Sequence, residues 1–188
     1  IAVGPEASRE AVAWGILLFR HRGVPVAVMQ RNGDQQTGSP DVQLAVMAAE
    51  RPAAAAVLAA VQEDLRANSI LRGQVISLGF DPYGRGGAGV TFLQRPSLPR
   101  DEVILPDGVL DRVRSHVLGI AGHRSRLQAA GQHLKRGVLL YGPPGTGKTH
   151  TVRHLLSESP GTTAVLLTGA ALGAIAQAAS LARAMAPS

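Results

Sequence analysis

Apolar residues recur in two different patterns along the first fifty residues. Those of residues 6–22 follow a helical spacing, which predicts an amphipathic helix. The apolar run 24–30 predicts a strand, and the Asn-Gly-Asp triplet at 32–34 predicts the turn that ends it. Alternating apolar positions at 42–46 predict a second strand. This part of the chain is therefore expected to mix helix and strand.

The next stretch continues that mixture. Pro52 suits the first turn of a helix whose apolar residues recur every four positions. Residues 74–78 and 90–93 predict a strand pair around a glycine-rich loop. Residues 84–89 of that loop match the G-x-G-x-x-G dinucleotide fingerprint, but they lack the flanking strand and helix and are interpreted as a hairpin loop. Residues 1–95 are predicted to form a small α+β domain with a recruitment or regulatory role.

The pattern changes after an extended, proline-containing linker at residues 96–100. Helices alternate from there with short apolar runs, in the order of a doubly wound parallel α/β sheet. The predicted elements are a short apolar stretch at 103–105, a helix from 107 to 116 or beyond, a second helix at 124–132, a strand at 138–141, a helix to about 157, a strand at 163–167 and a helix at 174–186. Residues 101–188 are thus expected to form the N-terminal half of such a domain.

Composition narrows the class of protein. With 188 residues, 45% of them hydrophobic, the chain can bury a core. It has no cysteine, which excludes disulfides and thiolate metal sites and fits a cytoplasmic location. The apolar run 11–19 is much shorter than the roughly 20 residues of a membrane span. A cytoplasmic protein without a membrane segment is therefore expected, and the Ile1 start suggests that the native N-terminus is missing.

The net charge of +6 and the pI near 11.0 raise the question of nucleic acid. Residues 112–136 carry arginine and lysine without any acidic residue. However, no aromatic residue that could stack on a base lies between Phe92 and Tyr141. The basic stretch is interpreted as a solvated helix face that attracts nucleotide. Nucleic acid is therefore not the expected partner and is kept as an alternative.

The strongest chemical signal follows the apolar run at 138–141. Gly142, Gly147, Lys148 and Thr149 fit the phosphate-binding pattern G-x-x-x-x-G-K-[ST]. Glycines let backbone N–H groups approach phosphate oxygens, and the positive end of the following helix dipole favours the same anion. The expected ligand is ATP with Mg²⁺, with Lys148 as the catalytic cation and Thr149 as the metal ligand. The expected nucleotide-binding residues are Gly142, Pro143, Pro144, Gly145, Thr146, Gly147, Lys148, Thr149 and His150.

The sequence of residues 131–149 resembles that of AAA-family ATPases. It includes the run Leu-Leu-Tyr-Gly-Pro-Pro-Gly-Thr-Gly-Lys-Thr. The spacing before the loop is most similar to the mitochondrial AAA translocase group and to bacterial AAA proteins. The resemblance covers roughly residues 101–188 and implies an ATPase that remodels or assembles a protein substrate. It also implies a homo-oligomeric ring, a hexamer in this family, and places Val103, Ile104 and Leu105 beside the adenine.

Several departures from the family limit what this chain is expected to do. After Lys148 the only acidic residue is Glu158, so no Asp-Glu pair follows to hold Mg²⁺ and polarise water. We expect ATP hydrolysis from a longer parent protein and not from these 188 residues alone. The family's sheet also places two further strands between residues 138–141 and 163–167, so the backbone at 138–141 is expected to lack partners.

Two smaller motifs complete the expectations. The pore triplet of AAA unfoldases begins with an aromatic residue, whereas the best match, Ala171-Leu172-Gly173, begins with alanine. This favours remodelling of a folded partner over threading. His150 and His154 are spaced i, i+4 but lack a third metal ligand, so both are interpreted as surface histidines. A nucleic-acid motor or loader and a non-hydrolysing ATP-binding scaffold remain alternative functions.

Overall fold

The computed structural model describes residues 1–32, 42–79 and 89–185 of the chain. They form two compact units, one made of residues 1–94 together with 162–188 and the other of residues 95–161. The break after residue 94 lies close to residue 95, where the N-terminal domain is predicted to end, and the domain assignment itself stays a prediction. Residues 162–188 belong to the first unit because their strand pairs with a strand of the N-terminal part. In the described ranges no helix combines the length and the apolar character that a membrane crossing requires.

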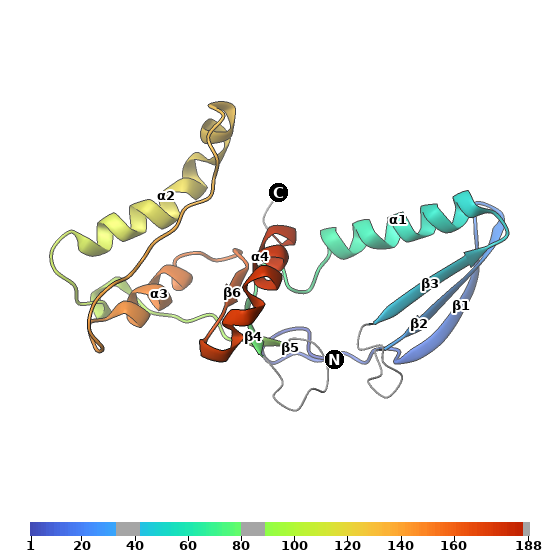
Figure 1. Ribbon diagram of the computed structural model, residues 1–188, viewed down its shortest axis with the longest axis horizontal. Coiled ribbons are helices and arrows are strands. Elements are labelled where there is room, and N and C mark those ends of the chain that lie inside the picture. Colours follow the sequence, from blue (N-terminus) through green and yellow to red (C-terminus); the bar gives the residue numbers. More distant parts are fainter. Residues whose placement is uncertain (33–41, 80–88, 186–188) are drawn as a thin grey trace. The chain divides into compact units, whose positions relative to one another are not determined.

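A three-stranded antiparallel sheet opens the first unit. It consists of β1 (Trp14–His21), β2 (Val24–Arg31) and β3 (Gln43–Ala48), in the order β1-β2-β3. Helix α1 (Arg51–Ala67) covers one face of this sheet (Figure 1). Val26 and Val28 of β2 pack against Val57 of α1, since alternate residues of a strand point to the same face. The strands at 24–30 and 42–46 and the helix after Pro52 are confirmed.

The helix predicted for residues 6–22 is wrong, because residues 14–21 form β1. β1 pairs with β2 along its whole length, from Trp14 opposite Arg31 to His21 opposite Val24. The tight turn between them has φ of 50° at Arg22 and 85° at Gly23. Two successive positive φ values define the type I′ turn, whose twist matches that of paired strands. Of the turn predicted at 32–34, residues 33 and 34 lie outside the described part of the chain.

A second sheet of the first unit joins segments that lie far apart in the sequence. β4 (Val75–Gly79) pairs antiparallel with β5 (Gly89–Leu93) and parallel with β6 (Ala164–Leu166), in the order β5-β4-β6 (Figure 1). The short helix η3 (Gly169–Ala174) and helix α4 (Ile175–Ala184) follow β6. The predicted pair 74–78 and 90–93, the strand at 163–167 and the last helix are confirmed. The predicted loop at 84–89 lies outside the described residues except for its last glycine.

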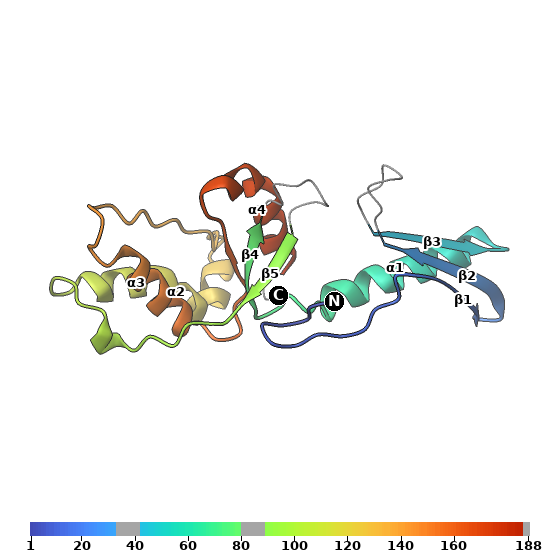
Figure 2. The same ribbon diagram turned by 90° about the horizontal axis from the view of Figure 1, so that it is seen from below.

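The second unit contains η2 (Arg100–Glu102), α2 (Val109–Ala129) and α3 (Lys148–Ser157). α2 and α3 lie side by side in both views (Figures 1 and 2). The two helices predicted at 107–116 and 124–132 are instead the single helix α2, which contains Gly119 and Gly122. Glycine lowers helix stability by about 1 kcal/mol relative to alanine, which weakens a helix without ending it.

The segment 138–141 is not a strand in the structure. Within the described residues it pairs with no other segment, and β6 pairs with β4 instead. Its side chains are largely outside any core, with Leu139 exposed to 90% and Tyr141 to 95%. The strand prediction is therefore wrong for the structure, whereas the expectation that this backbone lacks partners agrees with it.

Candidate functional site

The loop between residues 142 and 147 has a backbone that requires glycine. Gly142 has φ of 151° and Gly147 has φ of 82°, values that residues with a Cβ rarely adopt. A Cβ on Gly142 would also lie only 3.1 Å from Thr146 Oγ1. The loop leads directly into α3, whose first residue is Lys148 and whose N-terminus has no side-chain cap. Its first backbone N–H groups therefore remain available to an anion.

Lys148 extends over this loop. Its Nζ donates hydrogen bonds to the carbonyl oxygens of Gly142, at 2.8 Å, and of Pro143, at 2.6 Å. Thr146 Oγ1 donates to the same Pro143 oxygen at 2.9 Å, which closes the loop on itself. A phosphate oxygen is a stronger acceptor than a neutral carbonyl, because a charge-assisted hydrogen bond is roughly twice as strong. The ammonium group therefore lies where a bound phosphate could take over its hydrogen bonds.

Thr149 follows Lys148 at the start of α3, and its side chain is exposed. A hydroxyl oxygen is a suitable ligand for Mg²⁺, a hard cation that keeps several waters and binds few protein groups when phosphates complete its shell. The residue type and its position thus fit the predicted metal role. In the part of the chain that the structure describes, no cluster of three or more histidine or acidic residues could hold a metal ion by itself.

Two cavities flank the loop. The first, of about 490 Å³, has apolar residues before and within α2 on one side and the loop on the other. It is lined by Leu105, Val109, Val113, Val138, Leu139, Leu140, Tyr141, Gly142, Pro143, Thr146, Lys148 and Thr151. The second, of about 590 Å³, is lined by Gly142, Pro144, Gly145, Gly147, Lys148, Thr149 and His150. An apolar wall next to a phosphate-binding loop is an arrangement that suits a nucleotide, which has one flat apolar end and one charged end.

The three residues expected beside the adenine lie in three different environments. Leu105 lines the first cavity. Val103 is buried in a small core with Leu98 and Leu110, and Ile104 is 91% exposed. The structure thus brings Leu105 to the loop, while the adenine contacts of all three residues stay a prediction.

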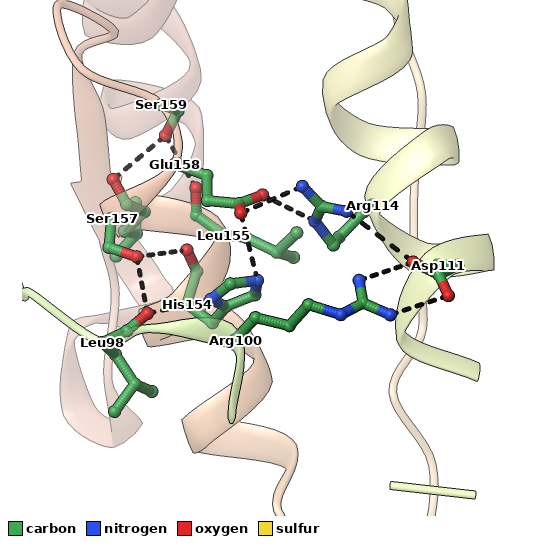
Figure 3. A network of polar contacts seen from close by, with 10 residues as sticks. Leu98, Arg100, Asp111, Arg114, His154, Leu155, Ser157, Glu158 and Ser159 are labelled. Carbon is green, nitrogen blue, oxygen red and sulfur yellow. Dashed lines mark hydrogen bonds and ion pairs between the residues drawn. The ribbon is translucent and has the colours of Figure 1, made fainter. Parts of the chain in front are cut away.

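A polar network at the far end of α3 was not foreseen from the sequence (Figure 3). Arg114 of α2 donates two hydrogen bonds to Glu158, from Nε to Oε2 at 2.6 Å and from Nη2 to Oε1 at 2.9 Å. These hydrogen bonds lower the pKa of the Glu158 carboxyl, desolvation opposes them, and the positive charges of Arg114 and Arg100 lower that pKa further. The only acidic residue after Lys148 is therefore held by an arginine.

His154 is not the surface residue that the sequence suggested. Its side chain is only 1% exposed, and its Nδ1 lies 2.9 Å from the carbonyl oxygen of Leu98. A buried imidazole needs such a partner, because an unpaired polar group is unfavourable away from water. The spacing to Glu158, four residues further along the helix, was a signal of contact that sequence reasoning did not use.

A second ion pair ties η2 to α2. Arg100 donates to both carboxylate oxygens of Asp111, at 2.6 and 2.8 Å. The hydrogen bonds lower the pKa of Asp111 and raise that of Arg100. Both side chains are about half exposed, at 51% and 54%, so solvent screens this pair.

Comparison with known proteins places the loop in a family. Residues 138–186 match the family model described as the ATPase family associated with various cellular activities (AAA). A protein of Sphaerobacter thermophilus named ATP-dependent zinc metalloprotease FtsH 2 is 36% identical over 96 residues, which is 46% of this chain and 15% of that protein. FtsH of Acidothermus cellulolyticus is 35% identical over 81 residues, 43% of this chain and 12% of that protein. FtsH of Mycobacterium tuberculosis is 57% identical over 35 residues, 19% of this chain and 5% of that protein.

The matched segment begins just before the phosphate-binding loop and contains α3, β6 and α4. Residues 138–186 are therefore similar to part of the AAA family, and the resemblance found in the sequence is confirmed. The chain spans only 15% or less of the length of these three relatives. Its mixed α/β fold is consistent with the N-terminal portion of such a domain.

Proposed function

We propose that this chain is the ATP-binding portion of a AAA-family ATPase that remodels or assembles protein partners. The observation that carries the proposal is the geometry of the loop 142–149, where Lys148 Nζ lies within 2.8 Å of the Gly142 carbonyl at the start of an uncapped helix. A loop of this kind combines a cation, helix N–H groups and glycine backbone around the place of one anion.

The chemistry of each residue follows from that placement. Lys148 binds the β- and γ-phosphates, and the first N–H groups of α3 bind the same phosphates. Thr149 would give its hydroxyl to Mg²⁺, and the ion would neutralise phosphate charge when bound with ATP. Leu105 supports the apolar base from the wall of the first cavity.

Hydrolysis requires more than binding, because water must be oriented and the charge developing on the phosphoryl group must be compensated. Glu158 is not free for that task, since Arg114 holds both of its oxygens. We therefore propose that this chain binds ATP and that turnover belongs to the longer protein, assembled as a homo-oligomeric ring in the cytoplasm.

The segment after β6 favours one of two ways in which the protein would act on a protein partner. Ala171 is 6% exposed within η3, whereas Leu172 is 58% exposed. A small buried residue cannot grip a polypeptide as an exposed aromatic side chain would. This favours remodelling or assembly of a folded partner over threading of an unfolded one.

Calorimetric titration of the chain with ATP and Mg²⁺ tests the proposal. The sequence has only two lysines, and exposed Lys135 makes a matched control for Lys148. Lys148→Ala should weaken ATP binding about tenfold to a hundredfold, since each charge-assisted hydrogen bond contributes about 1.5–3 kcal/mol. Thr149→Ala should mainly remove the part of the affinity that depends on Mg²⁺, and Lys135→Ala should change nothing. Equal ATP affinity in Lys148→Ala and the unsubstituted chain would refute the assignment, and tight DNA binding at physiological salt would favour the nucleic-acid alternative.

A further inference from the structure

Residues 98–105 form a strap that runs from one end of α3 to the other. The strap has its own anchors, because Leu98 and Val103 are buried, at 7% and 8% exposure, and pack with Leu110 of α2. One helical turn, η2, lies within it, and the Val103 amide donates to the Arg100 carbonyl at 3.0 Å. The sequence had suggested a spacer at 96–100, whereas this segment is packed into the second unit.

The strap contacts both ends of α3. At the C-terminal end, the Leu98 carbonyl oxygen accepts hydrogen bonds from His154 Nδ1 at 2.9 Å and Ser157 Oγ at 3.0 Å (Figure 3). At the N-terminal end, the Leu105 side chain adjoins Gly147, since a Cβ built on that glycine would lie 3.6 Å from Leu105 Cδ2. Gly147 directly precedes Lys148. The segment held by His154 is therefore the segment that reaches the phosphate-binding loop.

His154 is a polar side chain at a buried position of α3, where an apolar side chain would also fit. For His154 to donate a hydrogen bond to the Leu98 carbonyl oxygen, its ring must carry a hydrogen on Nδ1. Nε2 has no hydrogen-bond partner among the described residues and lies 3.5 Å from Glu158 Oε1. Glu158 is itself fixed by Arg114. An apolar side chain could fill the same space, but it would leave the Leu98 carbonyl with Ser157 Oγ as its partner, and the single hydroxyl hydrogen of Ser157 can also go to the His154 carbonyl at 2.7 Å. The histidine thus holds the strap on the helix together with Ser157.

We propose that the strap is a positioning element of the nucleotide site and that His154 couples it to the phosphate-binding loop. This inference rests on the proposed ATP binding and adds a residue that touches no part of the nucleotide. When His154 holds Leu98, the strap places Leu105 against Gly147 and in the wall of the first cavity. Linkage makes the effect reciprocal: docking of the strap raises ATP affinity, and bound ATP stabilises the docked strap.

Two substitutions of His154 separate positioning from simple packing. His154→Leu keeps an apolar side chain of similar reach and removes both ring nitrogens. His154→Asn keeps an N–H donor near the place of Nδ1 and removes Nε2. Arg153→Leu is the matched control, because Arg153 is the exposed neighbour on the same helix. Thermal unfolding of each variant shows whether it remains folded.

The measurement is amide hydrogen exchange across residues 98–105, with and without ATP and Mg²⁺, together with calorimetric ATP affinity. In the unsubstituted chain and in Arg153→Leu, ATP should slow exchange in the strap as well as in the loop. His154→Leu should bind ATP about five- to tenfold more weakly, in line with the usual range of coupling between sites, and should lose the protection of the strap. His154→Asn should restore most of both effects, which a residue needed only for packing would not do.

The outcomes distinguish this inference from the proposed function. ATP that protects the loop but leaves the strap unchanged would overturn the coupling alone. Unchanged affinity and full strap protection in His154→Leu would also overturn it. Failure of the unsubstituted chain to bind ATP would overturn the proposed function, and the coupling with it.

Discussion

Arg114 and Glu158 face each other in an ion pair with two hydrogen bonds, which joins α2 to the end of α3. Its distances are 2.6 and 2.9 Å, and the two side chains are 33% and 28% exposed. The helix that begins with Lys148 is therefore held at its far end by a charge of α2. A pair that is this well oriented and partly shielded contributes more to stability than an exposed pair does.

Replacing Glu158 with glutamine should reveal this contribution. The pKa of Glu158 is lowered in the folded chain, so its stabilising effect is present above the pKa of an unfolded glutamate and disappears as pH falls through the folded value. Glu158→Gln should lower the free energy of unfolding by about 1–2 kcal/mol at pH 7. Urea titrations at successive pH values should show this difference shrinking below about pH 4, near the ordinary glutamate pKa.

Asp111→Asn provides the comparison within the same network. Asp111 is 54% exposed, so its loss should lower stability less than that of Glu158 and should depend more strongly on salt. If Glu158→Gln matched the unsubstituted chain at neutral pH, the Arg114 pair would contribute nothing to the fold.

Ile76 should be among the residues to which the first unit is most sensitive. It lies in the central strand of the β5-β4-β6 sheet and is 0% exposed. Ile76→Ala should lower the free energy of unfolding by about 2–5 kcal/mol, the usual range for a large-to-alanine change in a core. Ile16→Ala is the control, because Ile16 is 54% exposed and its loss should stay within about 0.5 kcal/mol. Chemical denaturation would measure both, and equal losses would contradict the burial of Ile76.

Replacement by alanine should have opposite effects at two glycines, one in the turn between β1 and β2 and one inside α2. Gly23 has φ of 85°, so Gly23→Ala should destabilise the chain by about 1–2 kcal/mol. Gly119 lies inside α2, and a Cβ there would meet nothing within 4 Å, so Gly119→Ala should stabilise by up to about 1 kcal/mol. Thermal denaturation gives the signs directly. A stabilised Gly23→Ala variant would show that the turn has another conformation.

The sequence predicted the elements whose signal is local. The run 24–30 and the helix after Pro52 follow from periodicity alone. The phosphate-binding role of residues 142–149 follows from their motif and stays a prediction. The strand at 14–21 was missed because its conformation depends on pairing with β2 around a turn without the usual Asn-Gly or Asp-Gly signal. Long-range pairing of this kind overrides local preference.

Other features of the site depend on contacts that no local pattern encodes. His154 is buried because residue 98, fifty-six positions earlier, brings its carbonyl to the ring. The run 138–141 has the composition of a strand but has no strand beside it among the described residues. Both outcomes are decided by which segments meet in space, which periodicity cannot specify.

ATP turnover by the 188-residue chain should be absent. The proposed phosphate site would supply Lys148 and the Thr149 hydroxyl, but Glu158, the only acidic residue after Lys148, is engaged by Arg114. Phosphate release from the purified chain at several protein concentrations should therefore equal the background. Turnover that vanishes in Lys148→Ala would show that other residues of this chain are catalytic.

The location of ATP on the chain is the most direct test of the central claim. Backbone amide signals of the isotopically labelled chain can be followed by nuclear magnetic resonance as ATP and Mg²⁺ are added. The largest shifts should fall on Gly145, Gly147, Lys148 and Thr149, and adenosine without phosphates should leave these signals almost unchanged. Shifts confined to the basic helix α2, with the loop signals unmoved, would contradict the account.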